Sequence, residues 1–210
     1  MLSLAIFGGT FDPIHQGHLK ICNAIENYFN FDSVFFVPCK IPLLKTKAQA
    51  TNQQRIDMLQ LALSPYPKFR LDLRELERES PSYMIDTLKS FRKDYPQTSL
   101  TLIIGYDAWL TLPQWHQWQS LINFAHILVV TRGDNSQQEL PDELNKLLRA
   151  HETQDKAAFL TQQAGCIMHF NAGDYEISST QIREDIKLGK DVAGLVPEEI
   201  RAYIIRNKVY

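Results

Sequence analysis

Residues 2–25 read LSLAIFGGTFDPIHQGHLKICNAI, and this stretch decides which kind of fold the chain can adopt. The apolar run at residues 2–7 ends in two glycines, which is typical of a short buried strand. Apolar residues then recur at helical spacing over residues 17–29, and residues 34–37 form a second apolar run that stops at Pro38. A strand, a helix and another strand in this order indicate a βαβ unit and therefore a parallel sheet.

The same alternation continues along the chain. Further strands are expected at residues 69–73, 100–104, 127–130 and 167–170. Further helices are expected at residues 51–63, 80–95, 143–149 and 178–188, and from Val196 onward. The stretch 134–165 is polar, and we expect an excursion with one helix there. The sequence thus predicts an α/β fold with a doubly wound parallel sheet and helices on both faces. Residues 1–210 would form one domain, with a small C-terminal helical region at 178–210.

Composition and charge exclude several classes of protein. Hydrophobic residues make up 44% of the chain and charged residues 22%, which argues against disorder. A net charge of −2 gives no general basic field for nucleic acid, and no run approaches the ~20 apolar residues of a membrane span. Three cysteines without a CxxC pair indicate structural thiols in a reduced compartment. We expect a cytoplasmic protein that binds neither nucleic acid nor membrane, with assembly into a homo-oligomer left open.

The glycines and histidines of GGTFDPIHQGH have the pattern of an anion site. Gly8 and Gly9 let the backbone turn sharply after the strand and approach a phosphate closely. His15 and His18 are three residues apart, so they share a face once they are helical and can donate to phosphate oxygens. Two surface histidines after a plain turn, or a zinc site, are the alternatives. The helix N-terminus favours an anion over a metal cation.

A second motif with the same chemistry lies near the end of the chain, in ISSTQIR. Ser178 and Gln181 fit a capping box, which would leave the hydroxyls of Ser179 and Thr180 in the first helical turn. Arg183 follows one turn later, and its guanidinium can clamp phosphate oxygens. The alternative is an ordinary helix cap with Arg183 in solvent. The presence of both motifs in one chain favours a shared triphosphate site.

Weaker signals extend the candidate site. Asp107 follows a predicted strand and Gly105, where it would bind ribose hydroxyls or act as a helix N-cap. Trp115 lies in a turn-like LPQWH stretch, where it would stack on a flat ligand or pack against the fold. Three basic residues are candidate phosphate ligands, although each alone is more typical of a solvated charge: Lys45, Arg55 and Arg132.

Taken together, these motifs resemble those of the HxGH nucleotidylyltransferases. The intermediate stretches resemble one branch, which makes nicotinate adenine dinucleotide in NAD synthesis. They are Arg74-Glu75, Pro81-Ser82-Tyr83, Gly105-Tyr106-Asp107, Leu112-Pro113-Gln114-Trp115 and Leu195-Val196-Pro197. The resemblance covers nearly the whole chain and is weakest at residues 134–165. It implies a Rossmann-like fold and adenylyl transfer from ATP to nicotinate mononucleotide, with pyrophosphate released.

The resemblance also implies roles for particular residues. His15 and His18 would be catalytic. The ATP-binding residues would be Gly8, Gly9, Thr10, Phe11, His15, His18, Gly105, Asp107, Arg132, Ser179, Thr180 and Arg183. The substrate-binding residues would be Lys45, Tyr83, Met84, Ile85, Thr87, Trp115 and His116. Mg²⁺ is the implied cofactor and would arrive with ATP, so no dedicated protein cage for a metal is expected.

The chain departs from the resembled family at two places. The family often has PPHK or PPHR where this chain has Pro42-Leu43-Leu44-Lys45, so Lys45 keeps the positive charge while a leucine replaces an imidazole. His116 stands where an aromatic residue is common.

Two other functions remain open at this point. One is a related transferase that acts on nicotinamide mononucleotide, phosphopantetheine or another phosphorylated acceptor, and Trp115 and the Pro81-Ser82-Tyr83 segment favour a pyridine nucleotide among these. The other is a non-catalytic nucleotide-binding regulator, which would not need the full set of phosphate-binding residues. The choice of acid over amide rests on the resemblance alone.

Overall fold

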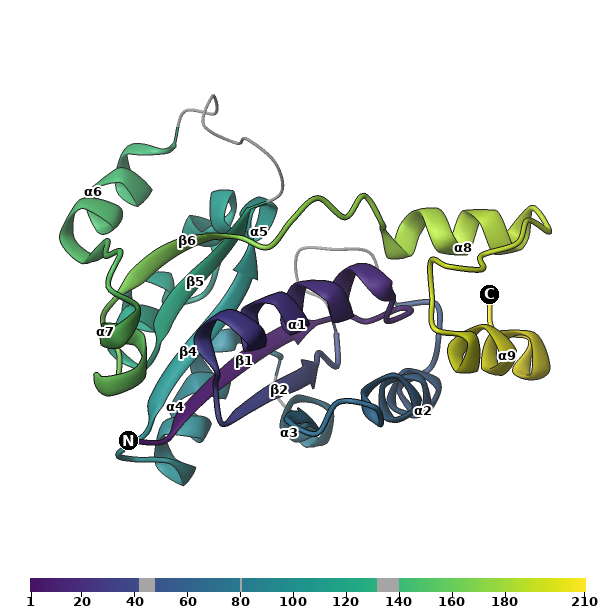
Figure 1. Cartoon of the computed structure of the whole chain (residues 1–210), viewed down its shortest axis with the longest axis horizontal. Coiled ribbons are helices and arrows are strands. Elements are labelled where there is room, and N and C mark those ends of the chain that lie inside the picture. Colours follow the sequence, from purple (N-terminus) through teal and green to yellow (C-terminus); the bar gives the residue numbers. More distant parts are fainter. Residues whose placement is uncertain (42–47, 80, 132–139) are drawn as a thin grey trace.

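The computed structural model of the chain describes residues 1–41, 48–79, 81–131 and 140–210. In these residues six strands pair in parallel in the order β3-β2-β1-β4-β5-β6 (Figure 1). The strands are β1 (Ser3–Gly9), β2 (Ser33–Pro38), β3 (Phe69–Leu71), β4 (Ser99–Gly105), β5 (His126–Thr131) and β6 (Ile167–Asn171). The expected parallel α/β sheet is confirmed.

Helices alternate with these strands along the chain. They are α1 (Gln16–Phe29), α2 (Asn52–Leu63), α3 (Arg74–Glu77), α4 (Met84–Asp94), α5 (Tyr106–Leu110), α6 (Asp142–His151), α7 (Lys156–Thr161), α8 (Ser179–Lys187) and α9 (Glu198–Asn207). Two 3₁₀ helices, η1 (Leu112–Gln114) and η2 (Trp118–Asn123), connect α5 to β5. None of the helices in the described ranges is long and apolar enough to cross a membrane.

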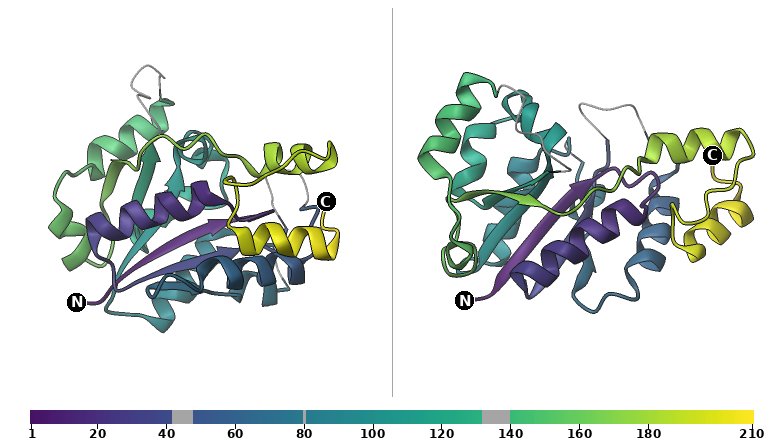
Figure 2. Two further views of the ribbon diagram at one scale, coloured as in Figure 1. Left: turned by 45° about the vertical axis from the view of Figure 1, so that its right-hand side comes forward. Right: turned by 45° about the horizontal axis from the view of Figure 1, so that its top comes forward.

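Successive strand residues point to opposite faces of the sheet, and each face has its own core. Ala5 of β1 packs in a cluster that includes Ile25 of α1 and Leu59 of α2. Its neighbour Ile6 packs in a second cluster that includes Leu88 of α4. Helices α1 and α2 therefore cover one face and α4 the other, as the two views of Figure 2 show. The predicted doubly wound arrangement is confirmed.

The strand order reverses between β1 and β4, and this reversal decides where a ligand can bind. In open parallel sheets, ligands occupy the crevice at the carboxyl ends of the strands where the order reverses. Gly9 ends β1 and Gly105 ends β4, so both predicted glycine motifs lie at this crevice. The topology thus assembles the site that the motifs indicate.

The C-terminal helices pack beyond the same end of the sheet. After β6 the chain runs back along the molecule to α8, which lies beside the start of α1 (Figure 1). Ile182 of α8 and Ile200 of α9 belong to the same buried cluster as Phe11 and Met58. Residues 178–210 therefore share a core with the first half of the sheet.

Three expected elements differ from those observed. Strand β3 ends at Leu71 rather than at residue 73, because the Asp72 carboxylate accepts hydrogen bonds from Arg74 and the chain turns into α3. Helix α4 begins at Met84 rather than near residue 80, because the Ser82 hydroxyl accepts the backbone N–H of Lys40 at 3.1 Å instead of capping a helix. The stretch after residue 134 holds α7 in addition to α6, with Asp155 as the N-cap of α7.

Candidate active site

The loop after β1 begins with two glycines that lie close to neighbouring side chains. A Cβ on Gly8 would lie 2.7 Å from Cε of Met84, and a Cβ on Gly9 would lie 2.9 Å from the Phe11 ring. Phe11 has a φ of 50° and its ring is buried, so only its backbone can face a nucleotide. Packing against the buried Phe11 ring thus requires glycine at position 9, whereas at position 8 the close atom is the end of the flexible Met84 side chain.

His15 and His18 open helix α1 and contact one another. His15 is the N-cap, and the two imidazole rings stack with centroids 3.7 Å apart. The backbone N–H of His15 donates to Nδ1 of His18 at 3.3 Å. Because Nδ1 accepts this bond, the neutral His18 ring carries its proton on Nε2. The predicted pair therefore lies together, with His18 set as a donor through Nε2.

Arg55 supports this loop from within the protein. Its guanidinium is fully buried and donates to the backbone oxygens of Thr10 at 2.7 Å and Cys39 at 2.8 Å, and to the Asn52 side chain at 2.7 Å. The sequence-based interpretation of Arg55 as a solvated charge is wrong, because α2 turns this side chain under the ends of β1 and β2. These partners are neutral oxygens, so Arg55 places a positive charge beneath the loop.

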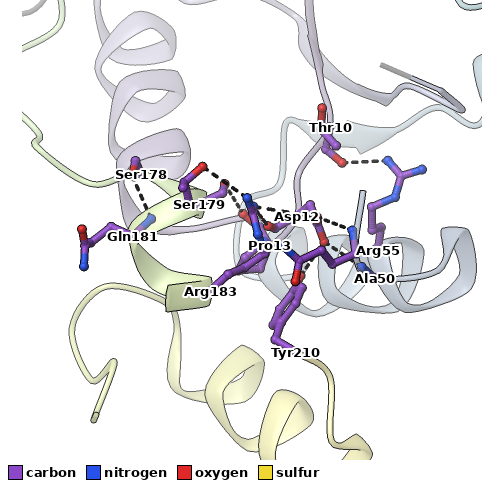
Figure 3. A network of polar contacts seen from close by, with 12 residues as sticks. Thr10, Asp12, Pro13, Ala50, Arg55, Ser178, Ser179, Gln181, Arg183 and Tyr210 are labelled. Atoms are coloured by element: carbon purple, nitrogen blue, oxygen red, sulfur yellow. Dashed lines mark hydrogen bonds and ion pairs between the residues drawn. The ribbon is translucent and has the colours of Figure 1, made fainter. Parts of the chain in front are cut away.

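Helix α8 docks directly on the same loop, as Figure 3 shows. The Ser179 hydroxyl donates to the Pro13 backbone oxygen at 2.9 Å, and Nη1 of Arg183 donates to the Asp12 backbone oxygen at 2.7 Å. The Arg183 side chain is only 12% exposed, so the alternative of a solvated arginine is wrong. The two motifs, far apart in sequence, thus form one surface.

The predicted capping box at the start of α8 is only half formed. The Ser178 hydroxyl accepts the backbone N–H of Gln181 at 3.1 Å, as expected. The Gln181 amide donates to Asp185 at 3.0 Å instead of returning to the cap. Thr180 accepts Nη2 of Arg183 at 3.2 Å, so its hydroxyl helps to hold the guanidinium.

The residues predicted to bind the acceptor lie around the start of α4. Tyr83 and His116 face one another with ring centroids 4.4 Å apart, and Trp115 is half-buried next to His116. Met84 covers Gly8, so the start of α4 lies against the end of β1. Ile85 is fully buried in the core behind them. The predicted acceptor and ATP residues are therefore neighbours.

Thr87, by contrast, is engaged inside the protein. It is fully buried, and its hydroxyl donates to Glu75 of α3 at 2.6 Å. Burial raises the pKa of the Glu75 carboxyl, although the Thr87 bond and the charge of Arg78 oppose this. Glu75 thereby ties α3 to α4, the helix whose N-cap is Tyr83.

The remaining candidates occupy the edge of the crevice or lie outside the described residues. Gly105 is the N-cap of α5, and a Cβ there would lie 2.7 Å from Oδ1 of Asp107. The alternative of Asp107 as an N-cap is therefore wrong, and its exposed carboxylate lies over Gly105. Lys45 and Arg132 fall outside the described residues.

Sequence reasoning gives no role to Asp12, Glu75 or Tyr210, although the structure connects all three to the site region. Asp12 lies within the quoted GGTFDPIHQGH motif and directly before Pro13, so the sequence could have marked it as a candidate residue of the loop. Tyr210 carries no local signal. Its hydroxyl reaches the Asp12 carboxylate at 2.8 Å across 198 positions of sequence.

A family profile and the similar sequences of known proteins both point to the same class of nucleotidyltransferase. The profile of the Cytidylyltransferase-like family matches residues 6–185. The chain is 50% identical over all 210 residues to the probable nicotinate-nucleotide adenylyltransferase of Legionella pneumophila (strain Corby), with both chains fully covered. It is 39% identical to the protein of that name from Serratia proteamaculans (strain 568), covering 98% of this chain and 94% of the relative.

Among solved structures, the chain resembles Plasmodium falciparum nicotinic acid mononucleotide adenylyltransferase complexed with NaAD. The TM-score is 0.75 at 18% identity, and the match covers 100% of this chain and 98% of the other. At 18% identity, this similarity shows that the two chains share a fold.

Proposed function

The chain belongs to the cytidylyltransferase-like family and, within it, to the nicotinate-nucleotide adenylyltransferases, and we infer that it transfers an adenylyl group from ATP to nicotinate mononucleotide. The products are nicotinate adenine dinucleotide and pyrophosphate. What supports this most directly is the docking of α8 on the loop after β1, through Arg183 to Asp12 and Ser179 to Pro13. It brings two phosphate-binding motifs to one crevice.

The chemistry suits a site built from hydrogen-bond donors. A phosphate oxygen of the acceptor attacks the α-phosphorus of ATP. The bond between that phosphorus and the oxygen that bridges the α- and β-phosphates breaks, and this oxygen leaves with the pyrophosphate. A phosphate monoester has its second pKa at about 6, so the nucleophile is already largely ionised at neutral pH and needs no general base. The enzyme has to bring two anions together and stabilise charge on the α-phosphate and the departing pyrophosphate.

We assign these tasks to the residues around the crevice. His18 donates from Nε2 to the α-phosphate as charge develops there. The triphosphate is held by the other donors, which are Thr10, His15, Ser179, Thr180 and Arg183. The buried charge of Arg55 lies under the Thr10 carbonyl and favours an anion above it. Positioning and electrostatics therefore carry the rate, without a covalent intermediate.

The acceptor would lie at the start of α4. Trp115 offers a face on which a pyridine ring can stack. A nicotinate carboxylate is negative, and the N-terminus of an 11-residue helix favours it over the neutral amide. Because Met84 contacts Gly8, a ligand here reaches the ATP site without a domain movement.

We propose that Mg²⁺ accompanies ATP and is bound by phosphate oxygens and water, the ligands that this ion prefers. The carboxylate in the loop, Asp12, is already engaged by two backbone N–H groups and a phenol, so the surface meets the nucleotide with donors. When bound, the ion would neutralise part of the phosphate charge. We also place the reaction in the cytoplasm, which fits three cysteines that are all free thiols.

The decisive test is acceptor choice. The purified chain, with ATP and Mg²⁺, is given nicotinate mononucleotide, nicotinamide mononucleotide, phosphopantetheine or no acceptor, and pyrophosphate release is measured. We expect release with nicotinate mononucleotide, with kcat/KM at least about tenfold above that for the amide. Equal use of the amide, or release only with phosphopantetheine, would contradict the proposed acceptor. No release with any acceptor would contradict the reaction itself.

A further inference from the structure

The Asp12 carboxylate is the centre of a buried network next to the proposed triphosphate site. It is 3% exposed. It accepts the backbone N–H groups of Gln49 at 2.8 Å and Ala50 at 3.0 Å, and the hydroxyl of Tyr210 at 2.8 Å (Figure 3). Three donors thus fix the orientation of one carboxylate in the loop that leads to His15.

The same residue holds Arg183. Nη1 of Arg183 lies 2.7 Å from the Asp12 backbone oxygen but 3.8 Å from the nearest carboxylate oxygen, Oδ2. The guanidinium is therefore bonded to the backbone, while the carboxylate charge is satisfied chiefly by other donors. Oδ2 accepts the Gln49 N–H, whereas Oδ1 accepts both the Ala50 N–H and the Tyr210 hydroxyl. Loss of the Tyr210 bond would leave Oδ1 with one donor, so the carboxylate could tilt and bring Oδ2 closer to Arg183.

Tyr210 reaches this point through an unusual backbone path. Helix α9 ends at Asn207, and Lys208 adopts the left-handed conformation with a φ of 49°. Val209 is then buried in the core, and Tyr210 itself has a φ of 81°. Non-glycine residues in this region cost about 1 kcal/mol or more each, so packing and hydrogen bonding must hold the segment in place.

Burial raises the pKa of the Tyr210 phenol well above its ordinary range, and the adjacent Asp12 charge adds to this. The hydroxyl therefore stays protonated and keeps donating throughout the neutral range.

A second tyrosine makes a bond of the same kind elsewhere. The Tyr203 hydroxyl of α9 donates to Asp57 of α2 at 2.7 Å. This bond joins the same C-terminal part to the body of the protein, but among the described residues neither partner has a hydrogen bond or ion pair to the loop after β1. Tyr203 is therefore a matched control for Tyr210.

We propose that Tyr210 is a positioning residue for adenylyl transfer, which orients Arg183 toward the triphosphate by holding the Asp12 carboxylate away from it. This role rests on the proposed function. It assigns to α9 and the residues after it a part in catalysis, in addition to their packing.

The test compares Tyr210→Phe with Tyr203→Phe, because each change removes one hydroxyl and leaves the ring. Steady-state pyrophosphate release is measured well below the melting temperature of either variant. For Tyr210→Phe we expect the KM for ATP to rise about fivefold and kcat to fall by a similar factor, with the KM for nicotinate mononucleotide within about twofold of the parent. For Tyr203→Phe we expect a similar loss of melting temperature and unchanged kinetic constants.

A double-mutant cycle with Arg183 distinguishes an effect of Tyr210 on the position of Arg183 from a general destabilisation of the protein. In an Arg183→Lys background, Tyr210→Phe should change the KM for ATP by less than about twofold, because the group it positions is already altered. Additive effects would overturn the proposal, and so would kinetics for Tyr210→Phe that match those of Tyr203→Phe.

ATP affinity, measured by calorimetry without acceptor, keeps this test independent of the reaction. We expect weaker ATP binding by Tyr210→Phe than by Tyr203→Phe even if the parent chain uses another acceptor. Equal ATP affinity of the two variants would overturn the role of Tyr210, whereas a parent chain that binds ATP but releases no pyrophosphate would contradict only the proposed function.

Discussion

Replacement of His18 by alanine is the sharpest test of how the reaction is catalysed. The His18 ring bonds the backbone and packs against other rings, including the His15 ring at 3.7 Å. Its Nδ1 accepts the backbone N–H of His15 at 3.3 Å, and it packs against the Phe11 ring with centroids 5.2 Å apart. The first contact leaves the ring proton on Nε2, the atom that we propose donates to the α-phosphate.

The cap bond and the proposed Nε2 donor give separate magnitudes for stability and for catalysis. Loss of the cap bond at the start of α1 should lower the free energy of unfolding by about 1 kcal/mol. Loss of a donor to charge that develops only in the transition state should lower kcat by about 10²- to 10³-fold. ATP affinity should fall by no more than about threefold, since Arg183 and the other triphosphate donors remain.

The assay is steady-state pyrophosphate release for kcat, with calorimetry for ATP affinity. His151→Ala is the matched control, because His151 also bonds the backbone through Nδ1, in its case the Gly165 oxygen at 2.8 Å, but on α6, away from the crevice. We expect its kcat to be unchanged. The reasoning fails if His18→Ala loses kcat and ATP affinity by the same factor, or if kcat does not fall.

Two further predictions concern stability. Arg92 donates to the backbone oxygens of Thr98, Phe124 and Gln163 at 2.7 to 2.8 Å, so Arg92→Met should cost about 2–3 kcal/mol of unfolding free energy. Urea denaturation measures this, and a change in either substrate KM would refute a purely structural role. Burial lowers the pKa of His126, whose Nδ1 accepts the Cys166 N–H, so the unfolded chain takes up a proton at higher pH than the folded one. Stability should therefore be full above about pH 6.5 and fall as the pH drops below it, by up to about 1.4 kcal/mol per unit. His126→Asn should flatten this slope, and a slope unchanged in the variant would contradict the assignment.

Local patterns in the sequence were enough for the parallel sheet and the longer helices. The helix expected at residues 51–63 begins with a capping box of Thr51 and Gln54, whose bonds of 2.8 and 3.2 Å join residues only three positions apart. Short elements such as α3, α5 and the 3₁₀ helices were not predicted. A helix of one or two turns shows too little periodicity to be recognised.

The errors about single residues share a physical cause. Arg55 carries a charge that a sequence alone places in solvent, and solvent was the alternative environment for Arg183. Arg55 is instead fully buried and the Arg183 side chain is 12% exposed, because both contact segments that are distant in the chain. Their partners are backbone oxygens, and a backbone oxygen leaves no trace in residue type. The predicted roles of Lys45 and Arg132 stay predictions.

The two phosphate motifs, the βαβ start and the family resemblance are all contained in the order of residues, because each depends on neighbours a few positions apart. The strand order that opens the crevice between β1 and β4, and the bonds that join Asp12 to Arg183 and Tyr210, depend on contacts across as many as 198 positions. Only the packing of α8 and α9 against the sheet brings those side chains together. Which tyrosine serves the reaction, and which serves only stability, is therefore a property of the tertiary structure.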